Sequence, residues 1–170
     1  APAQPAPPPA RAVPAPLAVV LDNAGGYPQQ GLAQATWTAE IPVEGGVTRL
    51  LPFFDAEEPR EVGPIRSARP YMIYLADDAA AVLVHVGGSP AAQARLAGDG
   101  ARNLDAMTEG PLFARDPNRG RAPVNTFAAG AALRAAAERY VADEDPRLVA
   151  QVRTTAPDGA PSATEVRIDW

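Results

Sequence analysis

The stretch AAVLVHVGGSP, residues 80–90, decides the class of fold because it reads as a strand that turns directly into a helix. Apolar residues 81–84 form a short buried strand, and a Gly-Gly pair then provides a turn. Ser89 is a suitable N-cap, and Pro90 suits the first helical position. The helix ends at Gly98. This unit predicts at least one right-handed βα step.

Further strands and a second helix surround this unit. The continuous apolar run LAVVLDN (17–23) predicts a buried strand. WTAEIPV (37–43) and VTRLLPFFD (47–55) flank the turn Glu44-Gly45-Gly46 and predict a hairpin. Pro70 predicts the start of a helix, PYMIYLADD (70–78).

The later part of the chain is more irregular. Residues 101–127 form a long polar region without a clear period, and such loops are often functional. The longest predicted helix covers residues 127–143, with Asn125 or Thr126 as its cap. Residues 147–170 contain two alternating segments that predict a closing hairpin. We therefore predict an α/β or α+β fold, a single domain with a mixed sheet flanked by helices, over residues 17–170.

Residues 1–16 are rich in proline and alanine and predict an extended segment of polyproline II character. The simplest interpretation is a tether, and the alternative is a segment laid against an envelope protein partner. The chain begins at Ala1 without methionine, so we expect a processed product from which a signal segment was removed. No apolar run reaches the length of a membrane span, so a membrane contact requires a removed or external anchor.

Composition excludes several classes of function. The chain has 170 residues and a net charge of -5, which argues against general nucleic-acid binding. There is no cysteine, so disulfides and cysteine metal sites are excluded. A single histidine excludes a multi-histidine metal site. We expect no metal and no cofactor.

The segment EVGPIRSARPY, residues 61–71, is the best candidate for a binding site. Arg66, Ser67 and Arg69 lie in the turn that leads into the helix at Pro70. Backbone N–H groups and the helix dipole favour an anion there, and two guanidiniums strengthen that preference. The alternative is that the arginines pair with nearby acids such as Glu44, Asp55 or Glu61.

Three predicted strands end in polar residues followed by two glycines: Asp22-Asn23, Glu44 and His85. Ligand sites in α/β sheets favour strand ends, so these side chains and the arginines are expected to share a cleft. In a hydrolase, Glu44 or Asp22 acts as the general base and His85 as the acid. The alternatives are a satisfied core histidine, turn chemistry at Glu44 and a loop cap at Asp22.

A charged loop carries Arg115, Arg119 and Arg121. It is either a solvated loop or a mobile lid that brings positive charge over the cleft. None of the common catalytic signatures occurs in the chain: it has no GxSxG, P-loop or HExxH motif.

Several segments form one succession in chain order: LAVVLDN, YPQQGLAQA, EIPVEGGVTRLLPFF, GPIRSARPY, VHVGGSP and FARDPNRGRAPVNTF. This succession, over roughly residues 17–140, resembles the N-terminal domain of the YerB-like (DUF3048) family of bacterial cell-envelope lipoproteins, which have no assigned biochemical function. The resemblance implies polar site positions at Asp22, Asn23, Glu44, Arg49, Arg66, Ser67, Arg69, His85 and Asn125.

The resemblance has one departure and one consequence for domain organisation. The family pattern PHN is Pro123-Val124-Asn125 here, so a reaction that needs a second imidazole is not expected. The family carries a second, β-rich C-terminal domain, which makes residues 147–170 the possible start of a truncated one.

Three functional hypotheses follow. The first is an extracytoplasmic domain that binds an anionic, sugar-phosphate or cell-wall glycan ligand through Arg66, Ser67 and Arg69, with Arg49, Asn23 and Asn125 contributing. The second is a structural accessory subunit of an envelope complex, joined to its partner through residues 1–16. The third is a hydrolase of cell-wall or phosphodiester material.

Overall fold

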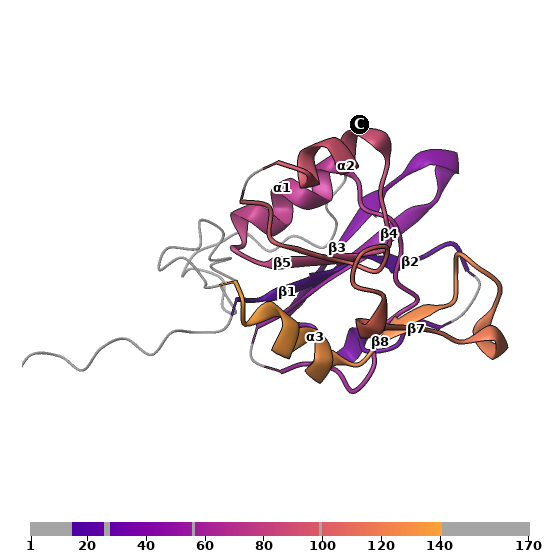
Figure 1. Cartoon of the computed structure of the whole chain (residues 1–170). Helices are drawn as coiled ribbons and strands as arrows, with labels where there is room; N and C mark the ends of the chain where they lie inside the picture. Colours follow the sequence, from indigo (N-terminus) through magenta and orange to yellow (C-terminus); the bar gives the residue numbers. More distant parts are fainter. Residues whose placement is uncertain (1–14, 26–27, 56, 99, 141–170) are drawn as a thin grey trace, which may run out of the picture.

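The computed structural model describes residues 15–25, 28–55, 57–98 and 100–140, and a mixed six-stranded sheet lies at its centre (Figure 1). Its strands are β1 (Leu17–Val19), β2 (Leu21–Asp22), β3 (Trp37–Pro42), β4 (Thr48–Phe54), β5 (Val82–His85) and β6 (Asn103–Asp105). The order is β2-β4-β1-β5-β6, and β3 also pairs with β4. β1, β5 and β6 are parallel, whereas β4 runs antiparallel to β1, β2 and β3. The predicted mixed sheet and single domain are confirmed.

The two faces of the sheet carry different layers, as Figure 1 shows. Helices α1 (Pro70–Asp78) and α2 (Pro90–Leu96) cover one face. Helix α3 (Gly130–Ala137) and the hairpin of β7 (Phe113–Arg115) and β8 (Thr126–Ala128) lie on the other. The central strands are buried on both sides, which explains why residues 81–84 read as a continuous apolar run.

Successive side chains of a central strand point alternately into the hydrophobic cores on the two faces of the sheet. Val82 and Val84 of β5 face the core under α3, whereas Leu83 faces the core under α1 and α2. Trp37 of β3 stacks on Phe53 of β4 with ring centroids 3.8 Å apart, on the side of α1 and α2. The sheet therefore joins two hydrophobic cores.

The starts of α1 and α2 are fixed by local chemistry, as the sequence predicts. Arg69 is extended, and α1 begins at Pro70 and ends at Asp78. At α2 the hydroxyl of Ser89 accepts a hydrogen bond from the Ala92 amide at 3.2 Å. No described helix has both the length and the apolar character needed to cross a membrane.

Two predictions for the later chain are wrong. Residues 101–127 are not one irregular region, since they contain β6, β7 and the start of β8. The helix predicted for residues 127–143 does not begin at residue 127 behind a cap at Asn125 or Thr126, and among the described helices α3, with eight residues, is shorter than α1, with nine. Residues 126–128 pair with β7 instead, Ala128 also bridges to Val62, and α3 begins at Gly130. The predicted extension over residues 1–14 and the hairpin within 147–170 lie outside the described residues.

One irregular segment, residues 62–68, connects the sheet to the β7–β8 hairpin. Ile65 bridges to Leu21 on one side, and its amide donates to the Thr126 carbonyl at 2.8 Å on the other. The Arg66 amide then donates to the Val20 carbonyl at 2.8 Å. These bonds fix the backbone from which the predicted site residues project.

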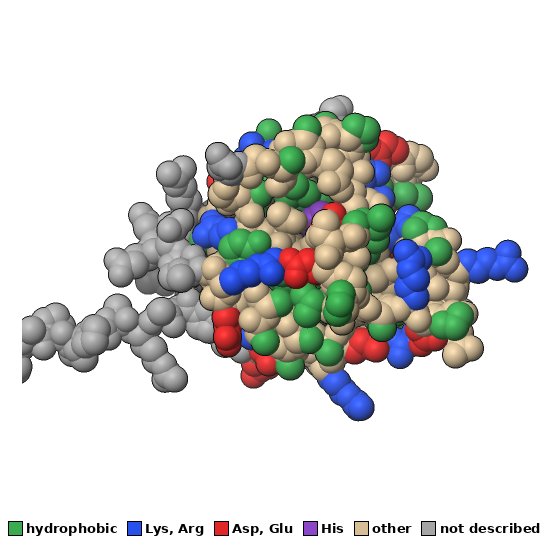
Figure 2. Space-filling view, in the orientation of Figure 1, with side chains coloured by type: hydrophobic (Ala, Val, Ile, Leu, Met, Phe, Trp, Pro, Cys, Tyr) green, Lys and Arg blue, Asp and Glu red, His purple; other side chains and the backbone are tan. Residues whose placement is uncertain are grey.

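Basic and acidic side chains are interspersed on the face shown in Figure 2. Blue arginine side chains project there beside red carboxylates, and no continuous basic surface forms. This distribution accords with the net charge of -5.

Candidate functional site

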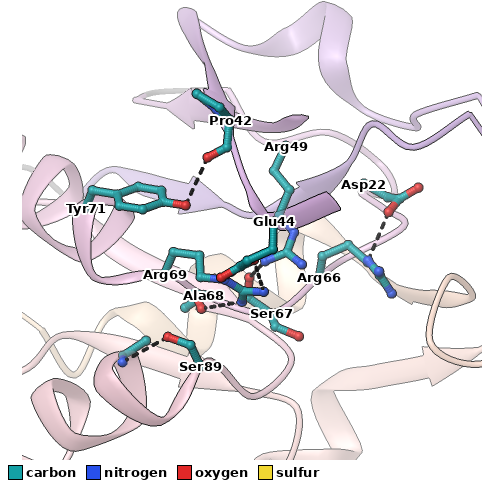
Figure 3. A network of polar contacts seen from close by, with 11 residues as sticks. Asp22, Pro42, Glu44, Arg49, Arg66, Ser67, Ala68, Arg69, Tyr71 and Ser89 are labelled. Atoms are coloured by element: carbon teal, nitrogen blue, oxygen red, sulfur yellow. Dashed lines mark hydrogen bonds and ion pairs between the residues drawn. The ribbon is translucent and has the colours of Figure 1, made fainter. Parts of the chain in front are cut away.

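Three arginines gather where residues 66–69 meet the β3–β4 hairpin, and we call Arg49, Arg66 and Arg69 the arginine cluster (Figure 3). Arg49 comes from β4, and the other two come from the segment before α1. The loop after β5 holds this segment in place, since the Ala68 amide donates to the Gly87 carbonyl at 2.9 Å. The turn that follows the β5 strand therefore positions the arginines.

Arg69 is clamped to Glu44. Its Nε lies 2.8 Å from both carboxylate oxygens, and its Nη2 lies 2.7 Å from Oε2. The Arg69 hydrogen bonds, aided by a backbone hydrogen bond, lower the pKa of Glu44 to about 2. The hydroxyl of Tyr71 also donates to the Pro42 carbonyl at 2.9 Å. These contacts fasten the hairpin tip to the start of α1, so the ion-pair alternative is confirmed for Arg69.

Arg66 is paired with Asp22, but only at one atom. Its Nε lies 2.9 Å from Oδ1 of Asp22, without the geometry of a hydrogen bond. Asp22 is buried, and its other oxygen accepts from the Ala24 amide at 3.2 Å. Both terminal amino groups of Arg66 have no partner among the described residues, and the side chain is 18% exposed. Arg66 thus keeps a free donor fork.

Arg49 is buried and has no carboxylate partner in the described part of the chain. Its Nη1 donates to the carbonyl of Ser67. Burial, followed by the charges of Arg69 and Arg66, lowers its pKa from the ordinary value. The cluster therefore sets three guanidiniums against two carboxylates.

Ser67 and the two predicted asparagines differ in their surroundings. The hydroxyl of Ser67 makes no hydrogen bond to another described residue. Asn23 is fully engaged: it donates to Glu40 and Thr48 at 3.1 and 2.7 Å. Asn125 is buried, and its Oδ1 has no partner in the described residues. Only Ser67 adds a free, partly exposed donor beside the cluster.

His85 is buried at the end of β5 with no exposed surface. Its Nδ1 lies 2.8 Å from the Gly87 carbonyl, which can only accept, so this nitrogen carries a proton. Its Nε2 lies 3.3 Å from Oδ1 of Asn103. Asp105 lies 3.8 Å away and accepts from the Gly87 amide at 2.7 Å. The histidine therefore braces the loop that holds Ala68.

The chain is similar in sequence to a described protein family and to one of its members. The sequence model described as "Protein of unknown function (DUF3048) N-terminal domain" matches residues 3–143. The chain belongs to this family. It is 32% identical over 160 residues to "Putative lipoprotein YerB" of Bacillus subtilis (strain 168), a match over 91% of the chain and 47% of the relative.

The solved structures give the same relationship for this DUF3048 domain. The crystal structure of YerB protein from Bacillus subtilis matches with a TM-score of 0.72 and 32% identity. That match covers 79% of this chain and 48% of the YerB chain. The chain thus spans about half the length of the relative it matches.

The charged loop of this DUF3048 domain does not contact the arginine cluster through Arg119. Arg119 pairs with Glu61, and its Nε lies 3.0 Å from Asp116. Its guanidinium also lies 4.6 Å from the centre of the Phe127 ring. Among the described residues, no group of three or more His, Asp or Glu side chains is placed to hold a metal ion.

Proposed function

We propose that this domain is an anion-binding module of the bacterial cell envelope, which holds an oxyanion of its ligand at Arg66. The observation that carries the proposal is the free donor fork of Arg66, whose terminal amino groups have no described partner. Two parallel N–H groups of a guanidinium match the oxygens of a carboxylate or phosphate.

The surroundings of Arg66 favour the same class of ligand. Arg49 adds a buried positive charge that forms no ion pair with a described carboxylate. Ser67 offers a hydroxyl beside the fork. Hydrogen bonds to a charged group contribute about 1.5–3 kcal/mol each, so this set suffices for a weak but specific site.

Within this proposal Arg69 has a positioning role. Glu44 occupies its guanidinium at Nε and Nη2, so few donors remain for a ligand. The pair instead fixes the hairpin next to Arg49 and the segment that carries Arg66. Of the predicted binding residues, the proposed site keeps Arg66, Ser67 and Arg49 and leaves out Arg69, Asn23 and Asn125.

The envelope location in this proposal rests on family membership, because the YerB relative of Bacillus subtilis is described as a putative lipoprotein. We expect this domain to face the outside of the cytoplasmic membrane. Cells that express the tagged full-length protein are converted to spheroplasts and treated with externally added protease. Digestion of the domain while the spheroplasts are intact is the expected result. Protection of the domain until lysis would overturn the location.

The hydrolase hypothesis receives no supporting observation. The His85 ring has no exposed surface, and its Nδ1 donates to the Gly87 carbonyl. Asp22 and Glu44 are each paired with an arginine. A general acid must come within hydrogen-bond reach of substrate, which this buried ring does not do.

Anion titration tests the proposed function. Inorganic phosphate and acetate are added at constant ionic strength, with chloride as the balancing anion, and binding is followed by calorimetry and by thermal unfolding. Phosphate is expected to raise the melting temperature. Ser67→Ala and Arg66→Lys are each expected to weaken phosphate binding about 10-fold. Ser67→Ala removes a hydroxyl donor and keeps the native pair of Arg66 with Asp22. Arg66→Lys removes the donor fork but leaves a cation beside Asp22.

Arg95→Ala is the matched control, because Arg95 is an exposed arginine paired with Asp77 at 3.0 Å on another element. It should bind phosphate like the parent protein. If neither anion binds more tightly than chloride, or if Arg95→Ala weakens binding as much as Arg66→Lys, the proposal is wrong.

A further inference from the structure

A cavity of about 550 Å³, which we call the Arg60 cavity, lies apart from the arginine cluster. Its wall includes Gln30, Gln34, Arg60, Glu61, Arg119 and Ala129, and none of its lining residues belongs to the cluster. This volume falls within the range of about 300–1,000 Å³ that small-molecule sites occupy.

The walls of this cavity are held by backbone contacts. Gln30 and Gly63 exchange amide hydrogen bonds of 2.8 and 3.3 Å. Gly31 has φ +84°, and a Cβ on it would lie 2.7 Å from the Glu61 carbonyl oxygen. The loop with both glutamines therefore packs too closely against residues 59–61 to admit any other residue at Gly31. A preformed wall lowers the entropic cost of binding.

Arg119 forms a fixed part of the cavity wall. It pairs with Glu61 and with Asp116 and lies over the Phe127 ring. The hydrogen bond with Glu61 raises its pKa above the ordinary value. Its charge is therefore already balanced by two carboxylates.

The remaining polar side chains of the cavity are free. The side-chain amides of Gln30 and Gln34 and the guanidinium of Arg60 make no hydrogen bond or ion pair with any described residue. Each amide offers two donors and one acceptor, and the guanidinium offers five donors. Arg60 is thus the cation of this cavity that no described carboxylate balances.

The start of α3 adds to this preference for negative charge. Its N-cap, Ala129, lines the cavity and provides no side-chain cap for the first turn. Unsatisfied N–H groups at a helix start favour an anion. This contribution supplements the charge of Arg60.

We propose that this cavity binds a small polyhydroxylated acid, such as an acidic sugar, with the carboxylate on Arg60 and the hydroxyls on Gln30 and Gln34. The lining contains no large apolar side chain, so the cavity does not suit an apolar ligand. Amides that both donate and accept match vicinal hydroxyls, which also do both.

Titration of the full chain tests this site by NMR, with D-glucuronate as the probe. D-Glucose supplies hydroxyls without charge, and acetate supplies charge without hydroxyls. Glucuronate is expected to bind with a dissociation constant of about 1 mM and to shift the amide signals of Gln30, Gln34 and Arg60. Both controls should bind more weakly.

Matched variants locate the site. Arg60→Ala is expected to weaken glucuronate binding about 10-fold and Gln34→Ala several-fold, and both positions are exposed, so the fold should be retained. Arg95→Ala should leave it unchanged. Because the shifted signals belong to Gln30, Gln34 and Arg60, which lie outside the arginine cluster, failure of this site and failure of the proposed function are distinguishable.

Three results would overturn the inference. The first is no binding of glucuronate up to about 50 mM. The second is equal weakening by Arg60→Ala and Arg95→Ala, which would indicate only a general charge effect. The third is acetate binding as tight as that of glucuronate, which would remove the sugar from the assignment.

Discussion

At the scale of single residues, Glu44 shows how an exposed side chain can hold a structural position. Its side chain is 68% exposed, yet Arg69 donates three hydrogen bonds of 2.7–2.8 Å to its carboxylate. The ordinary pKa of 4.5 falls to about 2 in the folded protein. The clamp on the hairpin tip therefore depends on pH.

We expect Glu44 to contribute stability above about pH 4.5 and to lose that contribution as the pH falls toward about 2. A lowered folded-state pKa means that the unfolded chain takes up the proton first, so acid favours unfolding. Melting temperatures of the parent and Glu44→Gln should differ most near neutral pH and converge in acid. Thermal unfolding followed by circular dichroism, from neutral pH down to about pH 2, measures this difference in melting temperature.

Glu57→Gln is the control, because Glu57 is exposed and has no described partner. Its melting temperature should stay close to that of the parent across the whole range. A constant difference between Glu44→Gln and the parent at every pH would contradict the assigned clamp.

The sequence predicts the members of the arginine cluster better than their partners. The polar strand ends correctly bring Asp22 and Glu44 near the arginines. Which carboxylate meets which guanidinium depends on how residues 62–68 cross the sheet, and no local pattern encodes that crossing. The free side chains of Gln30, Gln34 and Arg60 carry no distinctive local signal either, so the Arg60 cavity emerges only from the fold.

At the scale of elements, the helices that begin with proline are predictable and the short strands are not. Pro70 and the Ser89-Pro90 pair fix two helix starts through local chemistry. The strands β6, β7 and β8 have three residues each, and pairing with distant segments decides them. That pairing overrides helix propensity just before Gly130, which is why α3 begins late.

At Gly130, the first residue of α3, helix propensity and packing predict opposite effects of an alanine substitution on stability. Glycine-to-alanine exchange in a helix ordinarily gains about 1 kcal/mol. A Cβ at Gly130, however, would lie far inside van der Waals contact with the Pro59 carbonyl. Overpacking of this kind costs about 1–3 kcal/mol, so we expect Gly130→Ala to lower the free energy of unfolding in urea.

Ala131→Gly is the matched control on the next residue, which is exposed. It should lower the free energy of unfolding by about 1 kcal/mol through propensity alone. If Gly130→Ala instead stabilises the protein, α3 does not press against Pro59, and the wall of the Arg60 cavity is loosely packed there.

At the scale of the whole molecule, the sheet is the structure that both hydrophobic cores of the described residues share. Leu104 of β6 is buried in the core under α3, and Leu83 of β5 is buried in the core under α1 and α2. The two strands are parallel neighbours. Loss of packing on one face must therefore loosen the strands that the other face uses.

We expect Leu104→Ala and Leu83→Ala each to cost about 2–5 kcal/mol and to shift one common unfolding transition. Trp37, which packs against the Leu83 core, reports on that face by fluorescence once Trp170→Phe leaves it as the only tryptophan. Circular dichroism reports on the whole chain.

Since one sheet serves both cores, Leu104→Ala should move the Trp37 transition as far as the dichroism transition, even though the substitution lies on the opposite face. A Trp37 transition that stays at the parent midpoint in Leu104→Ala would mean that the two faces unfold separately, and the arginine cluster and the Arg60 cavity would then belong to different cooperative units.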